Sequence, residues 1–178
     1  MLAPPQPDAE DMLANGAFAA ILDALSRPGT TTLLPAPGPQ AIVPALIDRE
    51  CRVYADQPGL ERLLADAGAK IVPLHQADHV FFGPLTNAED LARLNPGSDL
   101  YPDDGATVVI EAQIGHGTSL RLSGPGIDGT QTIAIGGLPS GFWAARESVL
   151  RYPMGFDLLV VDEDRLLGVP RSTKVEVL

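Results

Sequence analysis

Lysine and cysteine are both scarce in this 178-residue sequence, and each shortage narrows what the protein can do. The only two lysines are Lys70 and Lys174, and the 12 lysines and arginines together face 23 acidic residues, which gives a net charge of −11. Because nucleic-acid backbones are bound by clustered basic side chains, we expect no nucleic-acid partner, whereas a basic protein partner stays possible. The single cysteine, Cys51, excludes an intramolecular disulfide and fits a reducing cytoplasm.

Long apolar runs and a targeting segment are missing as well. No stretch approaches the ~20 consecutive apolar residues of a membrane-spanning helix. Residues 1–8 have neither the basic nor the apolar region of a signal peptide; their three prolines predict an extended segment instead. We therefore expect a cytoplasmic protein with no membrane partner, folded as one domain over residues 1–178.

Nucleotide and hydrolase signatures are absent or incomplete. Residues 124–129 match G-x-G-x-x-G, but a strand pattern follows Gly129 where a dinucleotide site needs a helix N-terminus. These glycines therefore predict a turn. No Gly-x-Ser-x-Gly elbow or Walker A motif occurs. Neither Lys70 nor Lys174 lies in a recognisable Schiff-base motif, so we expect no pyridoxal phosphate, and no other cofactor.

The histidines and the cysteine do not form a metal site in the sequence. His75 and His79 are four residues apart at the ends of predicted strands, and His116 lies in a glycine-containing loop. No cysteine or carboxylate pair joins them at ligand spacing, so we expect no bound metal. Cys51 lies in an apolar strand without a basic neighbour, which predicts a buried, unreactive thiol.

The last thirty residues carry the strongest structural pattern. Residues 156–161 are almost continuously apolar, as in a strand that is buried on both faces. An acidic turn follows, and residues 165–169 are predicted to return as a hairpin partner. Residues 172–178 alternate between polar and apolar, which predicts a third strand with a buried chain terminus. Residues 158 and 160 are expected on one face of the central strand, and residues 159 and 161 on the other.

The remaining elements predict an α/β fold with a mixed central sheet flanked by helices in three layers. A first helix at residues 9–26 is expected to bury an apolar stripe formed by Met12, Leu13, Phe18, Ile21, Leu22 and Leu25. Residues 107–112 and 118–122 are predicted to be adjacent strands. Further helices are predicted at residues 41–47, 60–67, 88–94 and 142–150, and further strands at 30–34, 50–55, 70–74, 79–82 and 130–135.

Two groups of residues are candidates for function. Arg171, Ser172 and Thr173, with Lys174, form the one local cluster able to bind an anion by charge and hydroxyl groups. Asp157 lies in the predicted central strand and is expected to form a structural ion pair with Arg171 or Arg151. For protein interfaces, the candidate anchors are Phe142, Trp143 and Arg146 at a helix start and Tyr101 in a long loop.

Three segments, in order, resemble one known family. The C-terminal segment is residues 152–159 followed by 166–173, with Tyr-Pro-Met-Gly-Phe-Asp-Leu-Leu and Leu-Leu-Gly-Val-Pro-Arg-Ser-Thr. The first helix and its turn, residues 18–30, and the central strands, residues 104–110 and 120–127, also agree. Together they are similar to PhnH, a subunit of the bacterial carbon–phosphorus lyase system for phosphonate metabolism.

The resemblance implies a fold like that of the pyridoxal-phosphate-dependent transferases without their cofactor. It also implies a subunit of the carbon–phosphorus lyase core complex, the α-D-ribose 1-methylphosphonate 5-triphosphate synthase, that is non-catalytic alone and acts through assembly in organophosphonate catabolism. Its partners would be the other subunits, or a second copy in a homodimer when isolated. The residues considered without the resemblance leave an alternative function, namely an independent small-molecule or phosphate-binding enzyme that uses Arg171, Ser172 and Asp157.

Overall fold

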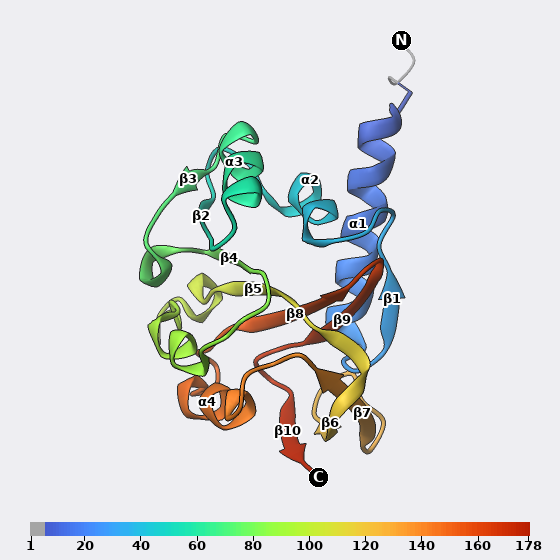
Figure 1. The fold of residues 1–178 in the computed structure, drawn as a ribbon, viewed down its shortest axis with the longest axis vertical. Helices are drawn as coiled ribbons and strands as arrows, with labels where there is room; N and C mark the ends of the chain where they lie inside the picture. The colour runs from blue at the N-terminus through green and yellow to red at the C-terminus, as the bar shows by residue number, and fades with distance from the viewer. Residues whose placement is uncertain (1–5) are drawn as a thin grey trace.

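The computed structural model describes residues 6–178, so residues 1–5 of the proline-rich segment, and the prediction made for them, lie outside the described residues. Figure 1 shows a sheet with helices on both faces and a first helix that extends beyond the body. The helices and strands are α1 Ala9–Ser26, β1 Thr31–Leu33, η1 Pro39–Ala41, α2 Val43–Leu46, β2 Arg52–Ala55, α3 Pro58–Asp66, β3 Lys70–Ile71, η2 Leu74–Gln76, β4 His79–Phe82, η3 Ala88–Arg93, η4 Pro102–Asp104, β5 Thr107–Glu111, β6 Gln113–Ser123, β7 Gln131–Gly136, α4 Phe142–Val149, β8 Asp157–Asp162, β9 Arg165–Val169 and β10 Lys174–Val177.

The central sheet has seven strands in the order β1-β9-β8-β5-β4-β2-β3. Strands β3, β2, β4, β5 and β8 are parallel to their neighbours, while β8 pairs antiparallel with β9 and β9 with β1. The sheet is therefore mixed, and the predicted α/β class and the β8–β9 hairpin are confirmed. Strand β8 has a neighbour on each side, as its almost continuously apolar sequence indicated.

Two apolar clusters cover the two faces of this sheet. One contains Leu159 and Val161 together with buried residues of α1, α2 and α3. The other contains Leu158 and Val160 together with residues of η3, α4 and the strands β6 and β7. The period-two alternation along β8 thus sends successive side chains to opposite clusters, which confirms the predicted faces.

Helix α1 packs through its small residues, which corrects the predicted apolar stripe. Its N-cap is Asp8, whose carboxylate accepts the Asp11 N–H. The buried positions are Ala17, Ala20, Ile21 and Ala24, whereas Met12, Leu13, Phe18 and Leu22 are exposed. The reason lies on β9, where a Cβ on Gly168 would be 2.5 Å from the carbonyl oxygen of Ala24. The two backbones can come this close only because the residues at the crossing are glycine and alanine, and of the predicted stripe only Ile21 is buried.

A second, three-stranded sheet, which the sequence pattern did not reveal, completes one face of the fold. Its order is β10-β6-β7, all antiparallel. The prediction that residues 107–112 and 118–122 pair as neighbours is therefore wrong, because β5 belongs to the central sheet and β6 to the small one. The two strands are separated only by Ala112, and the ladder of β6 with β7 shifts register between Ile114 and Thr118. This irregularity accommodates Gly115 and Gly117, both at positive φ.

The chain terminus is exposed, contrary to the expectation of a buried end. Strand β10 lies at the edge of the small sheet, and Val177 and Leu178 each leave more than half of their surface in solvent. Only Val175 packs against the core from this strand.

Two of the shorter elements differ from their prediction. Residues 88–93 form a 3₁₀ helix, and the strand that begins at Lys70 is two residues long. No helix within residues 6–178 is long and apolar enough to cross a membrane.

Candidate functional site

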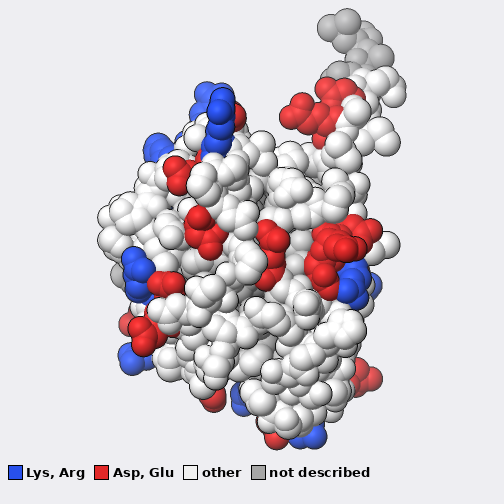
Figure 2. All heavy atoms as spheres, in the orientation of Figure 1, with Lys and Arg blue, Asp and Glu red and all other residues white. Residues whose placement is uncertain are grey.

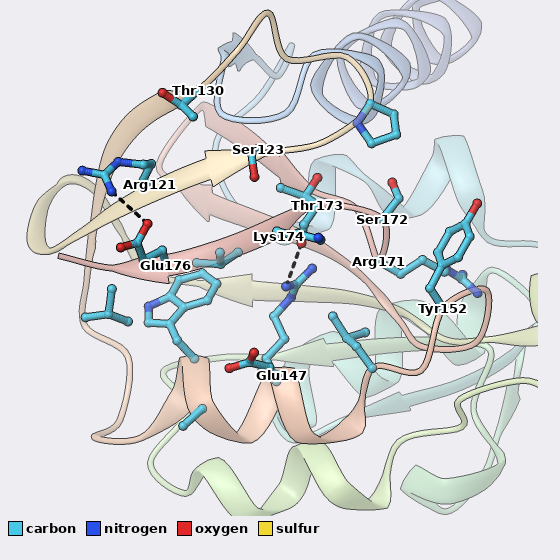
Figure 3. A pocket seen from close by; sticks show the side chains of 17 residues that line it. Arg121, Ser123, Thr130, Glu147, Tyr152, Arg171, Ser172, Thr173, Lys174 and Glu176 are labelled. Atoms are coloured by element: carbon cyan, nitrogen blue, oxygen red, sulfur yellow. Dashed lines mark hydrogen bonds and ion pairs between the residues drawn. The ribbon is translucent and has the colours of Figure 1, made fainter.

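An open cavity of about 1170 Å³ lies between α4, the small sheet and the segment that joins β9 to β10. Figure 3 shows Ser123 of β6 beside Thr173 and Lys174, above Glu147 of α4. In the antiparallel ladder, Lys174 is the register partner of Ser123, so their side chains leave the sheet on the same face. The cavity thus brings three distant parts of the sequence together: residues 121–130, 143–152 and 171–177.

Buried Arg146 supports the floor of this cavity. Helix α4 begins after Gly141, which has a φ of 79°, and places Arg146 beneath the chain that leaves β9. The guanidinium donates from Nη1 to the Thr173 carbonyl at 3.3 Å and from Nη2 to the Val169 and Pro170 carbonyls at 3.3 and 2.8 Å. Pro170 and Thr173 lie between β9 and β10, outside the ladders that would otherwise supply donors to their carbonyls. Arg146 therefore ties the β9–β10 segment to α4.

Arg146 carries its charge without a carboxylate partner. Its side chain is 2% exposed, and no ion pair among residues 6–178 includes it. Burial lowers the pKa of Arg146 to about 10, while the more distant charge of Asp157 acts in the opposite direction. The side chain is still positive at pH 7, because that value is well above neutrality. Its Nε and the neighbouring hydroxyl oxygen of Thr173 are both buried without a hydrogen-bond partner. The folded protein thus holds an uncompensated positive charge at the cavity wall.

Asp157 and Arg171 form the ion pair that the sequence predicted. Arg171 donates from Nη2 to Asp157 Oδ2 at 2.6 Å, and its backbone N–H donates to Asp157 Oδ1 at 2.8 Å. The same guanidinium also donates to the carbonyls of Pro102 and Gly105. Arg151, the other predicted partner of Asp157, is exposed and makes no such pair. The Arg171 guanidinium is occupied by protein acceptors and joins β8 to the loop before β5.

The expected interface anchors have mostly turned inward. Phe142 is 1% exposed and Trp143 9%, and their rings pack edge-to-face with centroids 5.0 Å apart. Arg146 is buried as described above. The structure therefore corrects the expectation that this helix start presents its aromatic side chains outward. Only Tyr101, which is 61% exposed, reaches solvent as an interface anchor would.

The histidines and the cysteine fall outside the cavity, whereas the glycine motif borders it through Pro125. Within residues 6–178, no three His, Cys, Asp or Glu residues are grouped so as to hold a metal ion. Burial lowers the pKa of His79, whose Nδ1 has no partner. Cys51 precedes β2 and is half-buried, which corrects its expected place in a strand, and burial raises the pKa of its thiol. Residues 124–129 connect β6 to β7, so the predicted turn is confirmed.

Only one wall of the cavity could be recognised from the sequence. The cluster of residues 171–174 was recognised from its charge and hydroxyl groups. The other polar lining residues that matter most, Arg121, Ser123, Glu147 and Tyr152, come from segments that only the small sheet and α4 bring together. No local spacing marks them, so no signal in the sequence alone was available to find them.

Comparison with known proteins agrees with the sequence resemblance. A profile of the family described as "Bacterial phosphonate metabolism protein (PhnH)" matches residues 9–176. A relative from Stutzerimonas stutzeri, named as the C-P lyase subunit protein HtxG, is 32% identical over 171 residues, covering 90% of this chain and 85% of the relative. Another from Rhizobium meliloti (strain 1021), named alpha-D-ribose 1-methylphosphonate 5-triphosphate synthase subunit PhnH, is 28% identical over 186 residues, covering 92% and 90%. The chain belongs to the PhnH family of bacterial phosphonate metabolism proteins.

Proposed function

We propose that this protein is a subunit of the carbon–phosphorus lyase core complex, the α-D-ribose 1-methylphosphonate 5-triphosphate synthase, and acts through assembly and not by catalysis alone. The names of its two relatives support the complex. The observation that carries the assembly is the set of large apolar side chains that α1 leaves exposed. We further propose that it works in the cytoplasm, where its one cysteine stays reduced.

The α1 surface, defined here as Met12, Leu13, Phe18 and Leu22, is unusual for a free protein. These side chains are 65, 46, 52 and 59% exposed. Among residues 9–16, Ala14 alone is partly buried, and Figure 1 shows this half of the helix extending away from the sheet. A helical segment as short as residues 9–16 is marginal in water by itself, so it gains most of its stability from packing. A partner that covers the α1 surface would supply that packing.

Charge indicates what kind of partner fits. Asp8 caps α1, and Glu10 and Asp11 lie in its first turn. Figure 2 shows acidic side chains near the start of α1 and a largely uncharged surface along the helix below them. The complementary surface is an apolar groove flanked by lysine or arginine, which we assign to another subunit of the complex. When the other subunits are missing, a second copy of the chain covers the α1 surface in a homodimer. This contact has to overcome the repulsion between two chains that each carry a net charge of −11.

Replacing Phe18 and Leu22 together by serine is expected to weaken assembly. Truncating two well-packed anchors should reduce the affinity for the other subunits by roughly 10- to 100-fold. Co-purification with the remaining subunits from the native host, followed by size-exclusion chromatography, measures this loss. Growth on methylphosphonate in a host that lacks its own homologue should fall in parallel.

Leu63→Ser on α3 is the matched control, because Leu63 is also a partly exposed helical leucine, at 39%. It should leave the complex intact. Light scattering on the isolated protein should give twice the mass of one chain, and a smaller mass for the double variant. A double variant that assembles and supports growth like the parent would exclude the α1 surface as the contact.

The alternative of an independent enzyme built on Arg171, Ser172 and Asp157 has less support. Arg171 and Asp157 bind each other, and the remaining donors of Arg171 contact the carbonyls of Pro102 and Gly105. These groups would have to leave buried partners before they could bind a substrate. Turnover of a phosphonate or nucleotide by the purified chain alone would favour this alternative.

The likeness to pyridoxal-phosphate-dependent transferases remains part of the proposal. We propose that the mixed sheet follows that fold while the chain forms no Schiff base. A catalytic lysine is activated by desolvation, whereas Lys70 and Lys174 are both exposed. Incubation with pyridoxal phosphate should therefore give no internal-aldimine absorption band. A band that is lost in either Lys70→Ala or Lys174→Ala would contradict this expectation.

A further inference from the structure

We propose that the cavity between α4, β6 and β10 binds the phosphate group of a small organic phosphate, with Lys174 as its charged contact. This binding function is separate from the assembly through α1. It rests on the distribution of charge in the chain, on the polar groups at the cavity wall and on the size of the cavity.

Positive charge is concentrated at this cavity in an otherwise acidic protein. Four of the 12 lysines and arginines line it, namely Arg121, Arg146, Arg171 and Lys174, against only Glu147 and Glu176 of the 23 acidic residues. A concave surface lined by one sign of charge focuses the field and raises the local concentration of the opposite ion. The cavity is therefore attractive to anions although the whole chain repels them.

Pairing within the protein leaves two of these cations uncompensated. Arg121 binds Glu176 at 2.9 Å, and Arg171 binds Asp157. Among the ion pairs of residues 6–178, none includes Lys174 or Arg146. Glu147 is the one lining carboxylate outside those pairs, so one positive charge is left in excess. A bound anion would compensate it and would also stabilise the buried charge of Arg146.

The donors suit a phosphate group in number and type. Lys174 offers three N–H donors on a flexible chain, and Ser123 is its register partner on β6. The hydroxyls of Ser172 and Thr173 belong to the same segment, and that of Thr173 has no partner. Phosphate oxygens accept several such bonds at once, whereas a neutral ligand would leave the excess charge unpaired.

The dimensions and apolar lining indicate an organic phosphate and not a free ion. The cavity, at about 1170 Å³, is somewhat larger than the ~300–1,000 Å³ typical of small-molecule sites. Trp143, Val175 and the exposed Tyr152 also line it, so an apolar or ring-containing part of a ligand has surfaces to contact.

The test uses inorganic pyrophosphate as the probe and the full-length protein in calorimetric titrations. The two lysines of the chain provide a matched pair, because each is exposed and each is the first residue of a strand. Lys174→Gln is expected to weaken pyrophosphate binding by roughly tenfold, the effect of one lost charge-assisted hydrogen bond. Lys70→Gln removes the same charge far from the cavity and should leave the affinity unchanged. Ser123→Ala should weaken binding by a smaller factor.

Malonate at equal ionic strength tests the preference for phosphate and should bind at least tenfold more weakly. The proposal is overturned if the parent protein binds no pyrophosphate at millimolar concentration, if malonate binds equally well, or if Lys174→Gln and Lys70→Gln reduce binding alike. These titrations need no partner subunit, so they succeed or fail independently of the proposed assembly.

Discussion

Leu159→Ala should lower the free energy of unfolding by about 2–5 kcal/mol, the range for truncating a fully buried leucine. Leu159 is 0% exposed in β8, where it lies opposite Val109 of β5 and Gly168 of β9. Its side chain belongs to the cluster beneath α1 and α2, and strands on both sides limit how far the site can collapse. The midpoint of chemical denaturation measures the loss.

Leu33→Ala is the control for this experiment. Leu33 lies on the edge strand β1 and is 67% exposed, so its truncation should change stability by no more than about 0.5 kcal/mol. Equal midpoints for Leu159→Ala and the parent protein would remove β8 from the centre of the fold.

The central strand could be predicted because its signal is local. The segment from Phe156 to Val161, apolar except for Asp157, indicates burial on both faces, and the acidic turn after it sets the return of β9. Both features depend only on neighbours in the sequence, and the structure confirms both. The α/β class follows from the same kind of evidence, namely the alternation of helical and extended patterns.

The packing of α1 could not be predicted, because it depends on a contact between distant residues. Hydrophobicity favoured the larger side chains, among them Phe18 and Leu22. The close approach of Ala24 to Gly168 on β9 decided otherwise, since only small residues fit where these two backbones cross. That contact leaves large apolar side chains of the helix outside the chain's own core, and these side chains form the α1 surface.

The small sheet and the cavity escaped prediction for the same physical reason. Strand β6 follows β5 with a single residue between them yet belongs to another sheet, and its partner β10 lies at the other end of the sequence. The cluster at residues 171–174 revealed one wall. Its counterparts on β6 and α4 have no spacing that relates them to it, so only the folded chain shows that they share a cavity.

Removing one member of the Asp157–Arg171 pair should destabilise the fold strongly. Arg171→Met and Asp157→Asn should each reduce the free energy of unfolding by about 3 kcal/mol, because each change leaves a poorly solvated partner unpaired. The side chains are only 14% and 22% exposed, and Arg171 also holds the carbonyls of Pro102 and Gly105. The double variant should lose less than the sum of the two, since it leaves no lone charge.

The exposed pair of Arg121 and Glu176 is the matched control for this double-mutant cycle. It has a similar contact distance of 2.9 Å, but its side chains are 45% and 63% exposed. The coupling energy of this exposed pair should be at most about 1 kcal/mol, as is usual for a solvated ion pair. Urea unfolding of the four variants in each cycle measures both couplings. If Arg171→Met folds and assembles like the parent but abolishes growth on methylphosphonate, Arg171 contacts a substrate and the independent-enzyme alternative gains its support.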